Sequence, residues 1–144
     1  MKKETIKAGQ LIIDFLAEAK DTDGALTMFE FTVPAGAKMP VPHYHENFDE
    51  TLYGVSGIMT YTVNGLKIEI APGETYFVPR GAIHGFENLH REDAKVLAVI
   101  TPALLGPEYF REIAEVANVA GPPDTGKLKT IMANYGLIPV PPKS

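Results

Sequence analysis

The sequence predicts a mainly β protein, an antiparallel sandwich or barrel with two short C-terminal α-helices packed outside the strands. Glycine (13 residues) and proline (12 residues) are over-represented in this chain of 144 residues, which favours many turns. Turn-forming residues recur every 8–12 residues or so through the middle of the chain, as in sandwiches and barrels. Apolar residues keep helical spacing over longer stretches in the last third. We expect one domain, residues 1–144, with strands over about 25–101 and helices over about 106–136.

The first strands are expected before residue 34. Residues 27–33 alternate between two faces, with Thr27, Phe29 and Phe31 on one of them. Residues 10–16 fit a strand and also a short amphipathic helix, and we favour the strand. Asp23-Gly24 between these segments is a good turn dipeptide.

The middle of the chain contains its clearest hairpin signal. Residues 58–63 and 66–70 flank Asn64-Gly65, and both of these residues tolerate the positive φ of a two-residue type I′ turn. Further strands are expected over 75–78 and 96–100, each bounded by proline and glycine or by proline alone.

Two helices are expected at the end. Pro107 suits a first helical position, and one apolar stripe is formed by Leu105, Tyr109, Phe110, Ile113, Val116 and Ala117. Asp124 or Thr125 is expected to cap a second helix that ends near Gly136. Both are too short to be stable alone and must pack on the strands.

Composition excludes several kinds of function. The chain has no cysteine, which excludes disulfides, thiolate metal sites and cysteine nucleophiles. Its formal net charge of −5, without a block of like charge, argues against nucleic acid and anionic membranes as partners. No apolar run reaches the roughly 20 residues of a membrane span, and acidic residues interrupt the N-terminal segment where a targeting signal would lie. We expect a cytoplasmic protein.

Three histidines and one glutamate have the spacing of metal ligands. His43 and His45 lie two residues apart, on one face of an extended strand, and Glu50 and His84 follow. Three imidazole nitrogens and one carboxylate oxygen suit a divalent first-row metal. Each residue alone also fits an ordinary surface or structural role. His90, beside Arg91 and Glu92, is expected to be exposed and without function.

The spacing His43-x-His45-x4-Glu50-x6-Gly57, followed by Gly73-x5-Pro79-x-Gly81-x2-His84-x3-Asn88, resembles the two motifs of the cupin superfamily. The first motif departs only at its opening glycine, because six residues rather than five separate Gly36 from His43. The resemblance implies a jelly-roll β-barrel in which His43, His45, Glu50 and His84 bind one metal. It leaves iron, manganese, nickel, cobalt, zinc and copper open. Asn88 is expected to be structural, bonding nearby backbone.

A substrate pocket should surround the metal. Phe86 lies two residues from His84 and Leu52 two residues from Glu50, so each should share the face of that motif residue. Further candidates, of which alternation should turn about half inward, are Phe29, Phe31, Met39, Met59, Tyr61, Tyr76 and Phe77. Ordinary core packing is the competing explanation for each of them.

The chain resembles small single-domain cupins described as quercetin-dioxygenase-like. This implies an oxygenase acting on a small anionic or aromatic substrate, with Glu50 as a proton acceptor as well as a ligand. Two alternatives stay open: metal-assisted isomerisation, decarboxylation or hydrolysis, and non-catalytic binding of a small molecule. Whether the protein is an enzyme is therefore undecided. The resemblance also implies a homodimer, in which residues 10–16 could cover a sheet edge.

Overall fold

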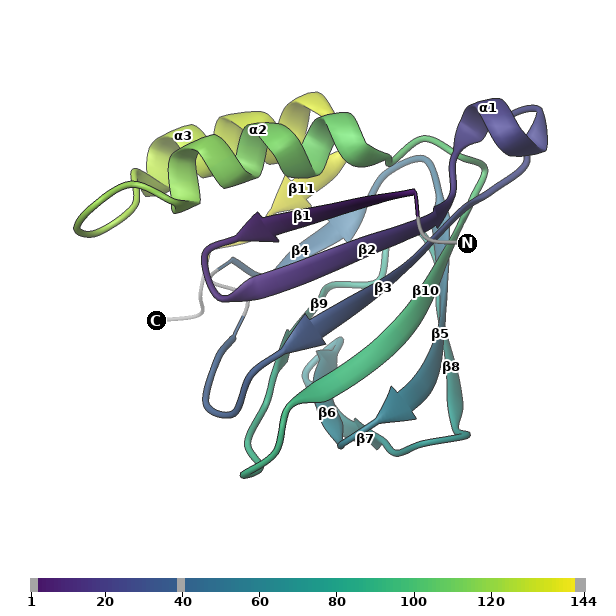
Figure 1. Ribbon diagram of the computed structural model, residues 1–144, viewed down its shortest axis with the longest axis vertical. Coiled ribbons are helices and arrows are strands. Elements are labelled where there is room, and N and C mark those ends of the chain that lie inside the picture. Colours follow the sequence, from purple (N-terminus) through teal and green to yellow (C-terminus); the bar gives the residue numbers. More distant parts are fainter. Residues whose placement is uncertain (1–2, 39–40, 142–144) are drawn as a thin grey trace.

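A computed structural model describes residues 3–38 and 41–141, and two antiparallel sheets dominate it (Figure 1). The first sheet has the order β1-β2-β3-β10-β5-β8 and the second the order β11-β4-β9-β6-β7. The strands are β1 (Glu4–Ala8), β2 (Leu11–Ala17), β3 (Thr27–Val33), β4 (His43–His45), β5 (Asp49–Ser56), β6 (Met59–Val63), β7 (Leu66–Ile70), β8 (Thr75–Val78), β9 (His84–Glu87), β10 (Ala94–Thr101) and β11 (Leu137–Pro139). The expected mainly β fold with antiparallel strands is confirmed.

The core lies between the two sheets, where alternate residues of the long strands meet. Thr27, Phe29, Phe31 and Val33 of β3 are buried, and their neighbours in sequence are half-buried. β10 follows the same alternation and pairs with both β3 and β5. A period of two places one set of side chains on one face of a sheet, so this pattern directs them into the core.

The expected hairpin forms as the sequence indicates. β6 pairs with β7 from Met59–Ile70 to Val63–Leu66, and Asn64 and Gly65 have φ values of 49° and 84°. Residues 10–16 also form a strand, since β2 lies between β1 and β3. β2 therefore pairs on both sides within its own chain, and β1 is the edge strand of the sheet.

A four-residue helix, α1 (Ala19–Thr22), precedes the expected Asp23-Gly24 turn. The sequence did not indicate it, because a single turn is too short to show helical periodicity. The backbone and side chain of Glu18 and the side chain of Asp21 form its capping box.

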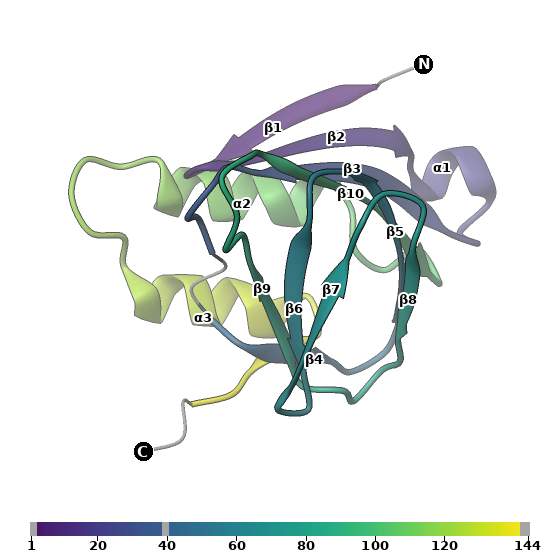
Figure 2. The same ribbon diagram turned by 90° about the horizontal axis from the view of Figure 1, so that it is seen from below.

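The two C-terminal helices close the opening between the sheets. α2 (Pro107–Ala117) packs on β1, α3 (Thr125–Asn134) packs on β11, and the helices pack on each other. Because β1 and β11 are the outermost strands of their sheets on this side, the helix pair bridges the two (Figure 2). Asp124 caps α3 by accepting a hydrogen bond from the Lys127 backbone N–H at 3.1 Å.

No helix in the described residues is long and apolar enough to cross a membrane.

Candidate metal centre

Two short neighbouring strands position three histidines. His43 and His45 lie on β4, and His84 opens β9, where it pairs directly with His43. The two-residue spacing turns both β4 side chains to the same face. All three histidines are buried, each with 3% or less of its surface exposed. The second sheet thus brings together residues about forty positions apart in the sequence.

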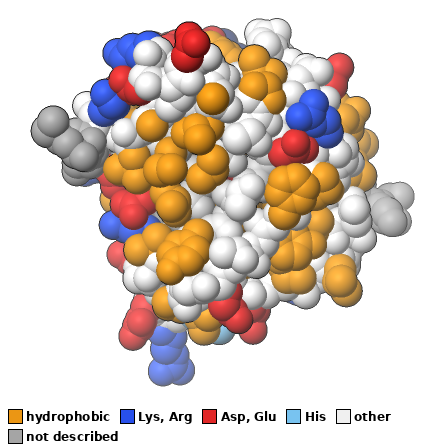
Figure 3. Space-filling view, turned by 90° about the vertical axis from the view of Figure 1, so that its right-hand side faces the viewer, with side chains coloured by type: hydrophobic (Ala, Val, Ile, Leu, Met, Phe, Trp, Pro, Cys, Tyr) orange, Lys and Arg blue, Asp and Glu red, His pale blue; other side chains and the backbone are white. Residues whose placement is uncertain are grey.

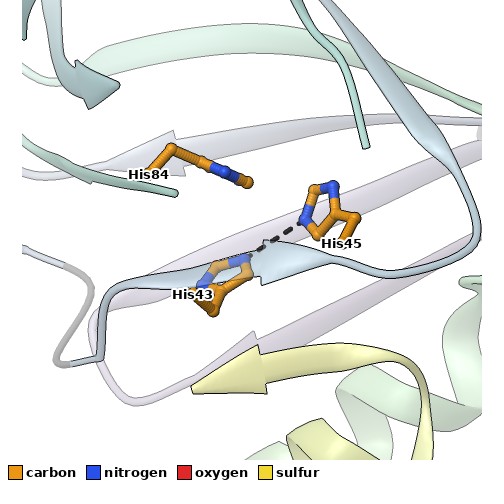
Figure 4. Close-up of side chains that lie close together, drawn as sticks. All are labelled: His43, His45 and His84. Carbon is orange, nitrogen blue, oxygen red and sulfur yellow. Dashed lines mark hydrogen bonds between the residues drawn. The ribbon is translucent and has the colours of Figure 1, made fainter. Parts of the chain in front are cut away.

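The three imidazoles converge on one point (Figure 4). One nitrogen from each ring lies within 4.8 Å of the other two, and the Nε2 atoms of His43 and His45 are 3.2 Å apart. No other group of three or more possible metal-ligating side chains occurs among residues 3–38 and 41–141. The arrangement has the compactness that a single ion requires.

Backbone carbonyl groups orient two of the rings. The Nδ1–H of His43 donates to the Val41 oxygen at 3.2 Å, and the Nδ1–H of His84 donates to the Ala82 oxygen at 2.9 Å. In a neutral imidazole this leaves Nε2 unprotonated, with its lone pair available. Metal-ligating histidines typically have such a partner on the second nitrogen.

His45 is held in a different way. Its ring stacks on Phe48 with centroids 4.5 Å apart, and its buried Nδ1 has no hydrogen-bond partner in the described structure. Phe48 is fully buried, and the sequence did not indicate that it would contact a histidine of the site. Its position three residues after His45, in a loop, gave no periodic signal.

The electrostatic environment keeps the histidines neutral. Burial, with a smaller contribution from the nearby His84, lowers the pKa of His43 to about 3. Burial, followed by His84 and His43, lowers the pKa of His45 to about 2. The pKa of His84 is also lowered, mainly by burial. Neutral imidazole is the form that binds metal, so the donor set fits a divalent transition ion.

Glu50 lies beside this group. Its Oε1 is 3.8 Å from the Nε2 of His84, and the residue is 8% exposed. The carboxylate is not among the donors that all lie within 4.8 Å of one another. Burial raises the pKa of Glu50 to about 7. The pKa of Tyr61 is also raised, mainly by burial and to a smaller extent by the charge of Glu50.

A cavity of about 550 Å³ extends from the histidines to the C-terminal helices. His43, His45, His84 and Glu50 line it, as do the predicted pocket residues Phe31, Tyr61 and Phe86 and the further candidate Phe29. This volume is within the usual range for a small-molecule site.

The other pocket candidates lie elsewhere or outside the described residues. Leu52 and Met59 are fully buried in the core and do not line the cavity. Tyr76 pairs with Leu52 from the edge strand β8, also away from the cavity, and Phe77 is 54% exposed. Alternation identifies the face of a strand but not how far along it a residue lies from the histidines. Met39 is outside the described residues.

The sequence did not indicate a large part of the cavity wall. Ala8, Gly9, Gln10 and Leu11 around the β1–β2 turn line it, together with Tyr109, Phe110, Ile113, Leu128 and Met132 of the helices. The helical stripe was evident from periodicity, but it was expected only to pack against strands.

Comparisons with known proteins are consistent with this geometry. The family model described as "Cupin domain" matches residues 29–100. Quercetin 2,3-dioxygenase of Bacillus subtilis is 30% identical over 112 residues, covering 78% of this chain and 32% of that protein. The tetracenomycin polyketide synthase protein TcmJ of Streptomyces glaucescens is 36% identical over 86 residues, covering 58% of each chain. This chain thus spans about a third of the first relative and somewhat over half of the second.

Solved structures share the fold. A predicted oxalate decarboxylase from Thermotoga maritima has a TM-score of 0.61 and 25% identity, covering 69% of this chain and 90% of that one. KdgF from Halomonas sp. has a TM-score of 0.58 and 24% identity, covering 71% of this chain and 86% of that one. At the latter identity the likeness bears on the fold alone.

Proposed function

Because this chain belongs to the cupin domain family, we propose that it is a metal-dependent oxygenase that acts on a small aromatic compound. One observation carries the proposal: three buried, neutral imidazoles converge at a cavity with an aromatic wall. The similarity to a quercetin dioxygenase supports dioxygen as the co-substrate.

His43, His45 and His84 would hold the ion through their Nε2 atoms. Nitrogen ligands without sulfur suit iron, manganese, nickel, cobalt, zinc or copper. A bound ion of this kind would supply Lewis acidity and, for a redox-active metal, electron transfer to dioxygen.

Glu50 has the position for two roles. It lines the cavity and lies 3.8 Å from a histidine nitrogen, so its carboxylate would either complete the ligand set or accept a proton from a substrate hydroxyl group. The surrounding apolar side chains exclude water from the carboxylate, which strengthens its interactions with charged groups.

The experiment is oxygen uptake by metal-reconstituted protein with a panel of flavonols and catechols, in air and under anaerobic conditions. His84→Ala should abolish uptake, because it removes one of three ligands. His90→Ala is the matched control, since His90 is exposed and, in the described structure, its side chain bonds only Glu69. Absence of uptake across the panel with every metal would contradict the proposal.

A second candidate is metal-assisted chemistry without oxygen, such as decarboxylation or isomerisation. The buried Glu50 beside the imidazoles favours it, since such reactions need a group that moves a proton. Product formed equally well under anaerobic conditions would identify this candidate. Tight ligand binding without any product would instead indicate a binding protein.

A homodimer is part of the same proposal. β1 is an edge strand, and the outer face over β5 and β8 carries the exposed apolar residues Tyr53, Val55 and Phe77. Figure 3 shows patches of hydrophobic side chains on that side of the molecule, separated by charged and other groups. Light scattering at micromolar concentration tests the dimer, and cell fractionation tests the expected cytoplasmic location.

A further inference from the structure

A continuous row of aromatic rings follows the cavity wall from α2 to Glu50. We call Phe110, Phe29, Phe31, Phe86 and Tyr61 the aromatic row, and all five line the cavity. Successive ring centroids are 5.3, 6.2, 5.1 and 5.6 Å apart. These are separations at which aromatic rings attract one another by edge and offset contacts.

The two ends of the cavity come from different parts of the chain. The histidines, Glu50 and four members of the aromatic row lie within residues 29–100, which match the family model. More than half of the cavity-lining residues in the described parts of the chain lie outside that range, on β1, β2 and the turn between them and on the segment from Leu105 to Leu137. Residues shared with the family therefore provide the chemistry, and flanking segments form much of the wall.

Packing against the first sheet holds α2 in place on the cavity wall. Phe110 contacts Phe15 and Phe29 with centroids 5.7 and 5.3 Å apart, and α2 packs on β1. On the same helix, Ile113 is half-buried and lines the cavity, whereas Glu115 is exposed. A wall anchored by aromatic packing keeps its shape, which selection by shape requires.

We propose that α2 determines substrate selection, and that the cavity takes a flat molecule of two or more fused or linked aromatic rings along the aromatic row. That the bound molecule is a substrate rests on the proposed function, whereas its binding in the cavity does not. An aromatic ligand gains edge and offset contacts with the row that a saturated ligand of the same size lacks. The volume of about 550 Å³ accommodates such a molecule.

The test measures binding of 1-naphthol and of its saturated counterpart, decahydro-1-naphthol, to the metal-free full chain by calorimetry. We expect 1-naphthol to bind at least fivefold more tightly. Ile113→Trp should weaken 1-naphthol binding at least tenfold by filling the cavity, and Glu115→Trp, which adds the same side chain on the exposed face, should leave it unchanged. Phe110→Leu should weaken it about three- to tenfold, as expected for the loss of one aromatic contact.

Thermal unfolding of each variant verifies that the fold is retained, and only folded variants are compared. Equal binding of the two probes, no binding of 1-naphthol, or an equal effect of the two tryptophan substitutions would overturn the proposal. Because no turnover or metal enters the measurement, the outcome is independent of oxygen uptake. A failed oxygenase assay with intact 1-naphthol selectivity would reject the proposed reaction and leave the binding site standing.

Discussion

Asn88 is a buried polar residue whose removal should cost stability without touching the metal centre. It is fully buried, and its Nδ2 donates to the carbonyl oxygens of Val33 at 2.9 Å and Glu92 at 2.7 Å. Its Oδ1 accepts from the backbone N–H of His90 at 2.9 Å. One side chain therefore ties β3 to the loop that follows β9.

The magnitude follows from the environments of these three bonds. The bond to Val33 is buried, so Asn88→Ala leaves a carbonyl without a partner at a cost of about 1–3 kcal/mol. The other two bonds are part-buried and contribute about 0.5–1.5 kcal/mol each. The expected loss is about 3 kcal/mol, which corresponds to a decrease in Tm of about 10 °C for a domain of this size.

Urea unfolding followed by circular dichroism measures this loss, and Asn118→Ala is the matched control. Asn118 also bonds backbone through both side-chain atoms, accepting from Gly9 N–H at 2.6 Å and donating to the Lys7 oxygen at 2.7 Å. Since it is exposed, water replaces its bonds, and its removal should cost about 1 kcal/mol or less. Equal losses for the two variants would refute the reasoning from burial.

Three further predictions concern packing, protons and metal. Gly54→Ala should lower the unfolding free energy by about 2–3 kcal/mol, measured by urea titration, because the new Cβ would lie 2.2 Å from the Ala71 backbone oxygen. In metal-free folded protein, the pKa of His43 is lowered to about 3 and that of His45 to about 2. Below about pH 6.5, therefore, only the unfolded chain binds protons at these two residues. Between pH 7 and pH 5 this lowers the unfolding free energy by about 2 kcal/mol for each histidine. Glu50, whose pKa is raised to about 7, binds its proton first in the folded state and offsets about one of these histidines, whereas the lowered pKa of His84 acts in the same direction as theirs. The unfolding free energy should therefore fall by at least about 2 kcal/mol between pH 7 and pH 5, and by more in Glu50→Gln. Cobalt(II) at a hundred times its dissociation constant should raise Tm by about 8 °C, a shift that a chelator reverses and that an unchanged Tm would contradict.

Local signals in the sequence determined much of the fold. Asn64-Gly65 defined a hairpin because few residues accept two consecutive positive φ values, and the structure has both. Pro107 and Asp124 marked helix starts because the first turn has unpaired N–H groups, which proline lacks and aspartate satisfies. β1, β4, β9 and β11 were not delimited, since three to five residues are too few to establish a period.

The sequence by itself also indicated a pair of residues that could hold a metal. The two-residue spacing of His43 and His45 places both side chains on one face of any strand. Only the tertiary structure decided which side chains surround them. Pairing of β4 with β9 brought His84 to the same point, and strand position separated Tyr61, on the cavity wall, from Met59, deep in the core. The placement of α2 and α3 over the opening between the sheets turned an apolar stripe into a cavity wall. Periodicity specifies the face of an element, whereas its neighbours in space depend on contacts between distant segments, which no local pattern encodes.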